Sequence, residues 1–217
     1  MIKAIIFDLD QTLLNRIATF TRFLEQQYNR FKHELHSVKA ADFVTAILKH
    51  DNNGYTPKID VYNTVCTDWN IPIQKALLDD FHEKYGTEPI LNVGALEVLQ
   101  QLNQRYILGL ITNGRAKGQN AKIDGASIRH YFKAIKISEI EGIKKPDPRI
   151  FERCLHDLGV AAAQAVYIGD HPEKDVAAAQ RVGMKGIWLS NSNYVRPDFA
   201  DGVIFSLKEL QKPILLF

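Results

Sequence analysis

The sequence has few of the features that mark secreted, membrane or nucleic-acid-binding proteins. It holds only two cysteines in 217 residues, Cys66 and Cys154, and they lie far apart in apolar, helix-like surroundings. We therefore expect buried free thiols rather than a disulfide or a metal-binding pair. No apolar run approaches the ~18 residues of a membrane span. The net charge of +2 gives no bias toward nucleic acid or a membrane surface, so neither is an expected partner.

Signals for export, repeats and low-complexity segments are also missing from the sequence. The chain runs from Lys3 directly into an apolar strand, which does not resemble a signal peptide. Hydrophobic residues make up 46% and charged residues 24%, the ordinary balance of a soluble globular protein. We therefore expect a cytoplasmic protein with one domain, or one domain carrying an insertion.

Two carboxylates follow the first apolar run. The strand-like segment Ala4–Phe7 leads into Asp8 and Asp10, and then into Gln11 and Thr12. Residues two apart in a strand share a face, and at a strand end such side chains can converge on one point. Holding two negative charges close together raises the free energy of the folded protein unless a cation binds between them. The alternative is that one aspartate only caps a turn, since Asp is common where strands end.

Residues 15–88 carry the helical spacing of a small all-helical unit. Helices are expected over 17–31, 40–50, 58–69 and 73–85, with Ile17 and Ile59 on the apolar stripes that pack together. Five basic side chains of this unit are expected to be solvated surface charges. They are Arg16, Arg22, Arg30, Lys32 and Lys58.

After Pro89 the pattern alternates between helix and strand. Strands are expected over 106–111, 134–137, 165–168, 186–189 and 203–205. Helices are expected over 93–104, 116–124, 149–158, 173–182 and 207–210. Alternation with continuously apolar strands predicts an α/β fold, a mostly parallel sheet with helices on both faces. In such sheets ligands bind beyond the carboxyl ends of the strands.

Polar residues gather where these strands end. Thr112 and Asn113 could be a turn and helix cap, or a cradle for an anion. Lys145 could be one of a solvated pair, or a side chain aimed by the prolines that follow it. Asp170 and Asp175 could be acids at a helix N-terminus, although that explains poorly a carboxylate directly after a buried strand.

Together these residue types suit phosphate chemistry. Oxygen ligands with few nitrogen or sulfur donors favour Mg²⁺, which binds one or two carboxylates, water and a substrate phosphate. A carboxylate beside that ion could attack the phosphate and form an aspartyl-phosphate. A second carboxylate could protonate the leaving group and then activate water, while a lysine neutralises developing charge.

Four stretches resemble the four motifs of the haloacid dehalogenase-like hydrolase superfamily, in the family's order. The first is Asp8-Leu9-Asp10-Gln11-Thr12, and the second is Thr112-Asn113-Gly114. The third is Lys145 within Lys-Pro-Asp-Pro, and the fourth runs from Gly169-Asp170 to Asp175. The resemblance implies a Rossmann-like core of residues 1–14 and 89–217, with residues 15–88 as a helical cap inserted after the first strand.

The resemblance also implies a role for each motif residue. Asp8 would be the nucleophile and a Mg²⁺ ligand, and Asp10 the general acid/base and a ligand through its backbone carbonyl. Thr112, Asn113 and Lys145 would bind the phosphoryl group and stabilise its charge. Asp170 would complete the metal site, supported by Asp175. Gln11 departs from the family's usual glycine, which puts in question only a special backbone conformation at that position.

The expected function is therefore a Mg²⁺-dependent phosphatase acting on a small phosphorylated metabolite. Alternatives are a phosphomutase, a metal-independent dehalogenase, which Asp10 argues against, and a catalytically idle ligand-binding scaffold. Phosphonate hydrolysis would need a cap lysine, for which Lys49 or Lys58 could be proposed, although surface charge explains both better. Arg16 and Phe20 are candidates for substrate contact, with core packing as the competing role of Phe20.

Two further expectations concern the connections and the chain end. Hinges near 14–15 and 89–92 would let the cap open and close. The apolar tail, residues 214–217, could pack on the body or on a partner, and the sequence is compatible with a monomer or a dimer.

Overall fold

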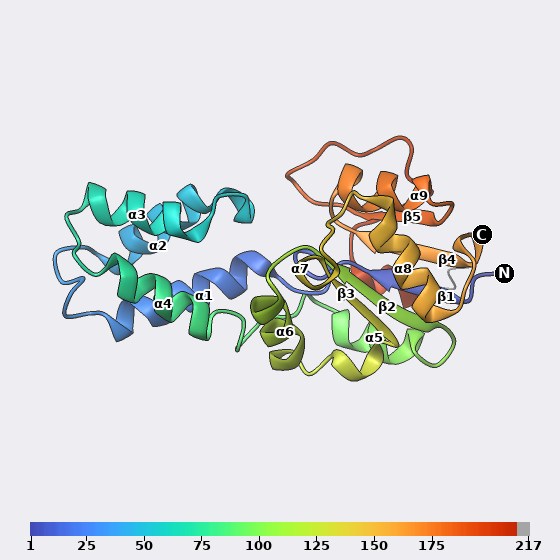
Figure 1. Ribbon diagram of the computed structural model, residues 1–217, viewed down its shortest axis with the longest axis horizontal. Helices are drawn as coiled ribbons and strands as arrows, with labels where there is room; N and C mark the ends of the chain where they lie inside the picture. Colours follow the sequence, from blue (N-terminus) through green and yellow to red (C-terminus); the bar gives the residue numbers. More distant parts are fainter. Residues whose placement is uncertain (212–217) are drawn as a thin grey trace. The chain divides into compact units, whose positions relative to one another are not determined.

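A computed structural model describes residues 1–211 and divides the chain into two compact units. One consists of Met1–Asn15 with Pro89–Phe217, and the other is Arg16–Glu88 (Figure 1). The apolar tail 214–217, for which packing was expected, lies outside the described residues.

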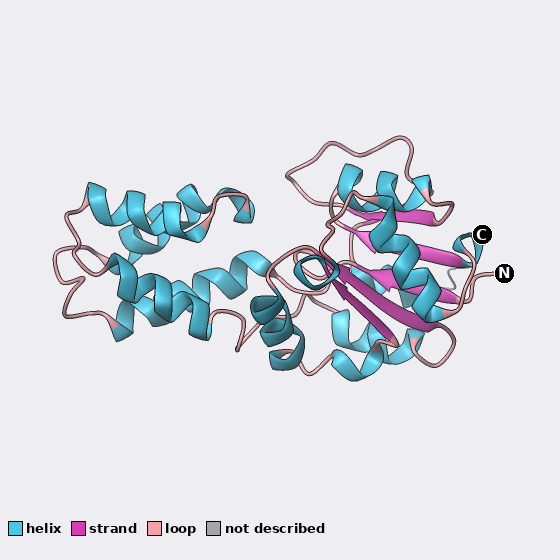
Figure 2. Ribbon diagram, in the orientation of Figure 1, coloured by secondary structure: helices cyan, strands magenta, loops and turns pink. Residues whose placement is uncertain are grey.

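The first unit is built on one six-stranded parallel sheet of order β3-β2-β1-β4-β5-β6. Figure 2 shows its strands in magenta, with helices around them. Phe7 at the end of β1 lies opposite Leu110 in β2 and Ile168 in β4. The carboxyl ends of these three strands therefore lie side by side, where the α/β pattern places a site. The strands are β1 (Ala4–Phe7), β2 (Ile107–Thr112), β3 (Ala134–Ile137), β4 (Ala165–Gly169), β5 (Lys185–Leu189) and β6 (Gly202–Ile204).

Alternate residues of β1, β2 and β4 enter two separate hydrophobic cores, one on each face of the sheet. Ile5 and Phe7 pack with α5 and α6 on one face, and Ala4 and Ile6 pack with α8 and α9 on the other. The predicted Rossmann-like α/β fold is thus confirmed. The helices of this unit are α5 (Ala95–Leu102), α6 (Ala116–Gly125), α7 (Ser138–Glu141), α8 (Pro148–Leu158) and α9 (Ala178–Arg181).

The helix expected over 173–182 is interrupted. A π-helical turn occupies Pro172–Ala177, and only Ala178–Arg181 is α-helical. The His171 ring caps this turn by accepting bonds from the N–H groups of Glu173 and Lys174. Because π-turns widen the backbone, side-chain spacing here differs from the helical spacing on which the prediction rested.

The second unit, inserted between β1 and β2, consists of packed helices. Phe20 and Phe23 lie at its core, with Phe20 in edge contact with Tyr85 at a centroid distance of 5.2 Å. Phe20 has no exposed surface, so core packing rather than substrate contact is its role in this unit. The helices are α1 (Arg16–Arg30), α2 (Ala40–Asp51), α3 (Lys58–Asp68) and α4 (Gln74–Lys84).

Two residues expected on the inward stripes of this unit face outward. Ile17 is 46% exposed and Ile59 is 45% exposed. The buried face of α1 includes the polar residues Thr19 and Gln27. A prediction that follows only apolar residues along the sequence does not detect these two positions.

Several basic residues of the helical unit, expected to be solvated, are bound to buried carboxylates. Arg16 and Lys58 both pair with Asp51, which is 1% exposed. Arg30 donates two hydrogen bonds to Asp80, at 2.9 and 2.6 Å. The interpretation as solvated surface charge was wrong for Arg16 and Lys58, whose side chains are 12% and 14% exposed, because the buried Asp51 requires a cationic partner. Arg30 lies at an exposed position, as expected, although it also pairs with Asp80.

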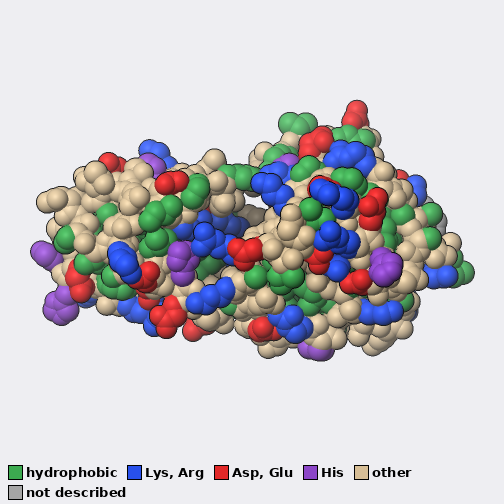
Figure 3. Space-filling model, viewed as in Figure 1, with side chains coloured by type: hydrophobic (Ala, Val, Ile, Leu, Met, Phe, Trp, Pro, Cys, Tyr) green, Lys and Arg blue, Asp and Glu red, His purple; other side chains and the backbone are tan. Residues whose placement is uncertain are grey.

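The remaining basic side chains and the thiols follow expectation. Arg22 meets Glu88 in an exposed ion pair, and both cysteines are free and buried. Figure 3 shows basic and acidic side chains intermixed over the face in view. Within residues 1–211, no helix combines the length and apolar character that crossing a membrane requires.

Candidate active site

Asp8 lies directly beyond the carboxyl end of β1. Its N–H donates to the Ile168 carbonyl at 2.9 Å, so the strand pairing with β4 extends to this residue. The chain then turns tightly, with the N–H of Gln11 bonded to the Leu14 carbonyl at 2.7 Å. Gln11 adopts a φ of +64°, the left-handed conformation for which glycine is usual. The special conformation is therefore present here in spite of the glutamine.

Lys145 joins two of the predicted acids. Its Nζ lies 2.5 Å from Asp8 Oδ1, 2.7 Å from Asp175 Oδ1 and 2.9 Å from the Tyr167 hydroxyl. The Lys145 side chain is 4% exposed, and burial alone would lower its pKa. The two carboxylates outweigh burial and raise the pKa of Lys145, so the side chain is a fixed positive charge.

Asn113 holds the backbone of Lys145. Its side-chain Nδ2 donates to the Lys145 carbonyl at 3.0 Å, and its Oδ1 accepts from the Lys145 N–H at 2.9 Å. This pair of bonds ties the end of β2 to the lysine loop. The Asn113 side chain thus has a positioning contact, in addition to the substrate-binding role expected for the residue.

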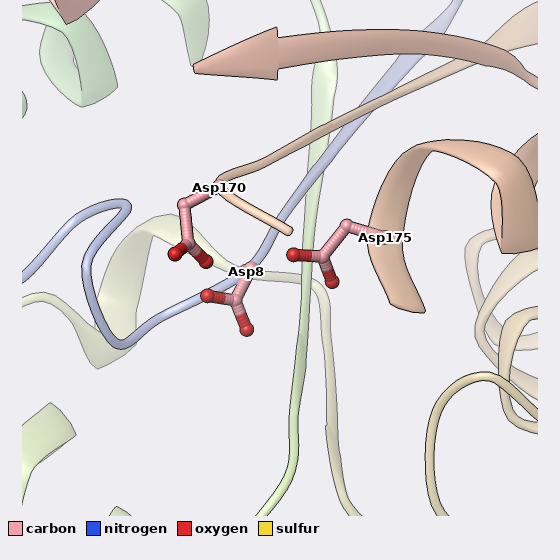
Figure 4. A group of neighbouring side chains, drawn as sticks. All are labelled: Asp8, Asp170 and Asp175. Atoms are coloured by element: carbon pink, nitrogen blue, oxygen red, sulfur yellow. The ribbon is translucent and has the colours of Figure 1, made fainter. Parts of the chain in front are cut away.

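Three carboxylates converge beside this lysine. One oxygen from each of Asp8, Asp170 and Asp175 lies within 4.8 Å of the others, and Figure 4 shows the side chains pointing toward one another. Burial, with the other carboxylates nearby, raises the pKa of Asp8 to about 7 and that of Asp170 to about 8. Lys145 opposes both shifts without cancelling them. A bound divalent cation would offset this concentration of negative charge, so the residues fit Mg²⁺.

Gly169 permits this convergence. A Cβ at residue 169 would lie 2.5 Å from Cβ, Cγ and Oδ2 of Asp175. The Asp175 side chain therefore occupies the space that any other residue would need, and its Oδ2 accepts from the His171 N–H at 3.0 Å. Asp175, expected only to support the site, places an oxygen in the carboxylate group itself.

Asp10 points to a different set of partners. Lys122 Nζ lies 2.8 Å from each of its carboxylate oxygens, and Gln119 Nε2 lies 3.0 Å from Oδ2. Gln119 also contacts Thr112 Oγ1 at 2.5 Å. Within the described residues, the Asp10 carboxylate is thus outside the three-acid group, which is compatible with metal binding through its backbone carbonyl alone.

Three contact residues were not identified from the sequence. Lys122 and Gln119 lie in the middle of α6, and Tyr167 lies within β4 with its hydroxyl bonded to Lys145. The signal for Tyr167 is a tyrosine within an apolar strand, since a buried hydroxyl needs a partner. Gln119 and Lys122 are one helical turn apart and share a face, but polar helix positions are common and gave no distinct pattern.

The family model for haloacid dehalogenase-like hydrolases matches residues 5–189. A glyceraldehyde 3-phosphate phosphatase of Pyrococcus furiosus is 29% identical over 96% of this chain and 91% of its own. The crystal structure of a HAD phosphatase from Thermococcus onnurineus has a TM-score of 0.68, 26% identity and 97% coverage of both chains. A 2-haloacid dehalogenase structure from Pseudomonas syringae has a TM-score of 0.65, 25% identity and the same coverage.

These likenesses, with the four motifs gathered at one sheet edge, establish the class. The chain belongs to the haloacid dehalogenase-like hydrolases. It is a hydrolase acting on phosphoric monoesters, as are its named phosphatase relatives.

Proposed function

We propose that this protein is a Mg²⁺-dependent phosphatase that hydrolyses a small phosphomonoester through an aspartyl-phosphate on Asp8. The observation that carries the proposal is the convergence of Asp8, Asp170 and Asp175 around one point, with Lys145 bonded to two of them. Asp8 and Asp170 follow the ends of the parallel strands β1 and β4, and with the buried Asp175 and Lys145 they are arranged to receive a phosphate and a cation.

The chain's own residues divide the reaction between them. Asp8 attacks phosphorus, and the P–O bond to the leaving alcohol breaks as the Asp8–phosphorus bond forms. Asp10 gives a proton to the leaving oxygen, then takes one from the water that releases phosphate. Lys145 and Thr112, with Asn113, bind the phosphoryl oxygens. Mg²⁺ held by Asp8, the Asp10 carbonyl and Asp170, with Asp175 in support, would neutralise phosphate charge.

The two units have separate roles in this proposal. Residues 1–14 and 89–217 form the catalytic core, and residues 15–88 form a cap that selects the substrate. Hinges at 14–15 and 89–92 would allow the cap to open and close. The name of the Pyrococcus furiosus relative makes three-carbon phosphate esters the first substrates to test. Free, buried thiols are compatible with the proposed cytoplasmic location.

The first test measures phosphate release from a panel of small phosphomonoesters, including glyceraldehyde 3-phosphate, with Mg²⁺ and with a chelator. We expect turnover that needs Mg²⁺ and falls at least about 10³-fold in Asp8→Asn, because an amide cannot act as the nucleophile. Asp42→Asn, on the exposed face of α2, is the matched control and should retain activity.

Other outcomes separate the alternatives. Turnover of a 2-haloacid without metal would favour a dehalogenase, and transfer of phosphate between two hydroxyls of one sugar would favour a phosphomutase. If the wild-type protein binds phosphate esters but does not react with them, with or without Mg²⁺, the result would favour a catalytically idle ligand-binding scaffold.

A further inference from the structure

Helix α6 carries two buried polar side chains beside the site. Gln119 is 4% exposed and Lys122 is 5% exposed. Lysine is rarely buried without a partner, and here its ammonium is bonded to both oxygens of Asp10. These two residues therefore hold groups that the proposed reaction uses.

The Lys122 ammonium fixes the orientation of the Gln119 amide. Its Nζ lies 2.9 Å from the side-chain oxygen of Gln119, and an ammonium can only donate hydrogen bonds. The atom that faces Lys122 must therefore be Oε1. The amide NH₂ group consequently faces Asp10 and Thr112, where it donates to both.

This orientation sets the direction of the Thr112 hydroxyl. Thr112 Oγ1 accepts a hydrogen bond from Gln119 Nε2, so its own proton points elsewhere. A hydroxyl whose acceptor side is occupied in this way is arranged to donate to an anion. The chain of donors thus runs from Lys122 through Gln119 to Thr112.

The same pair keeps Asp10 apart from the other acids. Its two oxygens receive bonds from Lys122 and Gln119, and its side chain is 22% exposed. These bonds offset the negative charge of Asp10 and direct its carboxylate away from its like-charged neighbours. A general acid must lie within reach of the leaving oxygen rather than beside the nucleophile.

Gly114 makes room for the pair. Its φ is +149°, and a Cβ there would lie 2.9 Å from Cγ and Cδ of Gln119. The absence of a side chain at Gly114 therefore leaves the space that the Gln119 side chain occupies.

We propose that Lys122 and Gln119 are positioning residues that direct the Thr112 hydroxyl toward the phosphoryl group and hold Asp10 at the leaving-group side. This inference rests on the proposed phosphatase function for its kinetic part. Its binding part, the donor direction of Thr112, is independent of turnover.

The binding experiment measures the Kd of inorganic phosphate by calorimetry with Mg²⁺ present. In Gln119→Glu the nearly isosteric side chain can only accept, so it draws the Thr112 proton to itself. We expect phosphate binding at least about 10-fold weaker, whereas Gln101→Glu, at an exposed position of α5, should bind like wild type. Phosphate affinity equal to that of wild type in a folded Gln119→Glu protein would overturn the Thr112 part.

The kinetic experiment compares Lys122→Met with Lys122→Arg, and with Lys117→Met on the exposed side of α6. For an alkyl phosphate we expect kcat to fall on the order of 10²-fold in Lys122→Met, with KM changing less. For p-nitrophenyl phosphate the loss should be smaller, because its leaving group needs little protonation. Lys122→Arg should recover part of the activity, and Lys117→Met should equal wild type.

The outcomes distinguish this inference from the proposed function. An active wild type with equal losses on both ester classes, or no loss, would contradict the role in holding Asp10. A wild type without turnover would reject the phosphatase and with it the Asp10 role, while the calorimetry would still decide the Thr112 role. Should Lys122→Met not fold, Lys122→Gln, which keeps a hydrogen-bond donor and loses the charge, is compared with Lys122→Arg on the same two esters.

Discussion

Gly169, at the end of β4, leaves the space in which the Asp175 carboxylate lies beside Asp8 and Asp170. Replacing it with alanine would force a methyl group into the Asp175 carboxylate, whose Cγ and Oδ2 lie only 2.5 Å from the position that the methyl carbon would take. We expect Gly169→Ala to lower kcat on the order of 10²-fold, since displacement of a site group by about 1 Å has effects of that size.

The control for this prediction is Gly118→Ala, in α6. A Cβ at Gly118 meets nothing within 4 Å, and alanine is favoured over glycine inside helices by about 1 kcal/mol. Steady-state kinetics and thermal melts of both variants separate the two effects. Equal kcat in Gly169→Ala and wild type would show that the position of Asp175 is not critical.

Asp170 should make stability depend on pH when no metal is bound. Its pKa is raised from 3.8 to about 8, first by burial and then by Asp175 and Asp8. Between these values the folded state holds a proton that the unfolded state has lost, so this residue's contribution to stability declines as pH rises toward 8. Asp170→Asn removes that dependence. With a chelator, we expect the variant to melt higher than wild type at pH 8.5, by an amount that shrinks as pH falls toward 4.

Addition of Mg²⁺ should reverse this order. Wild type should gain stability because the ion binds the folded state, and Asp170→Asn should gain less because it lacks a ligand. A chelator-treated wild type that melts above the variant at pH 8.5 would argue against the raised pKa.

Sequence and structure agree best on residues that end strands. Asp8, Thr112 and Asp170 follow apolar runs directly, so their placement at one edge of a parallel sheet could be predicted. The positions of Lys122 and Gln119 beside the site could not be predicted. They depend on how α6 packs against the strand ends, and no local sequence pattern indicates this packing.

At the scale of the element, Gln27 is the polar link between three helices. It is fully buried in α1, donates to the Leu77 carbonyl and Asp80 of α4, and accepts from the Tyr62 hydroxyl of α3. We expect Gln27→Leu to lower the free energy of unfolding by about 2 kcal/mol or more, since buried partners would lose their bonds.

Chemical denaturation of the full chain, followed by the near-UV signal of the aromatic helices, measures this loss. Gln26→Leu is the matched control, because the side-chain bond of Gln26 to Glu88 is exposed to solvent. Similar changes in the two variants would mean that the buried network contributes little.

The sequence predicted where helices and strands occur better than it predicted irregularities within them. The expected strand 134–137 has the observed bounds of β3, and the helix expected over 116–124 ends one residue beyond, at Gly125. The π-helical turn Pro172–Ala177 could not be foreseen, because it arises where Asp175 bonds back to the His171 N–H, a contact specific to the folded site.

For the whole molecule, alternation of helix and strand was sufficient to predict a parallel sheet. The structure also has a helical insertion, residues 16–88, as a second compact unit. The paired buried charges of that insertion were not predictable from spacing. Arg16 and Asp51 are 35 residues apart in the sequence and meet only through tertiary packing.

The position of β1 in the middle of the sheet has a consequence for how the chain acquires its structure during synthesis. Ala4 pairs with Ile107 on one side and with Ala165 on the other, so the first strand made has no partner strand until β2 has been synthesised. The helices of residues 16–88 find their contacts among themselves, and local contacts form fastest. On the ribosome, the inserted helices should therefore fold while β1, which precedes Asp8, is still unpaired. The active site should form only after β4 has been synthesised and has paired with β1.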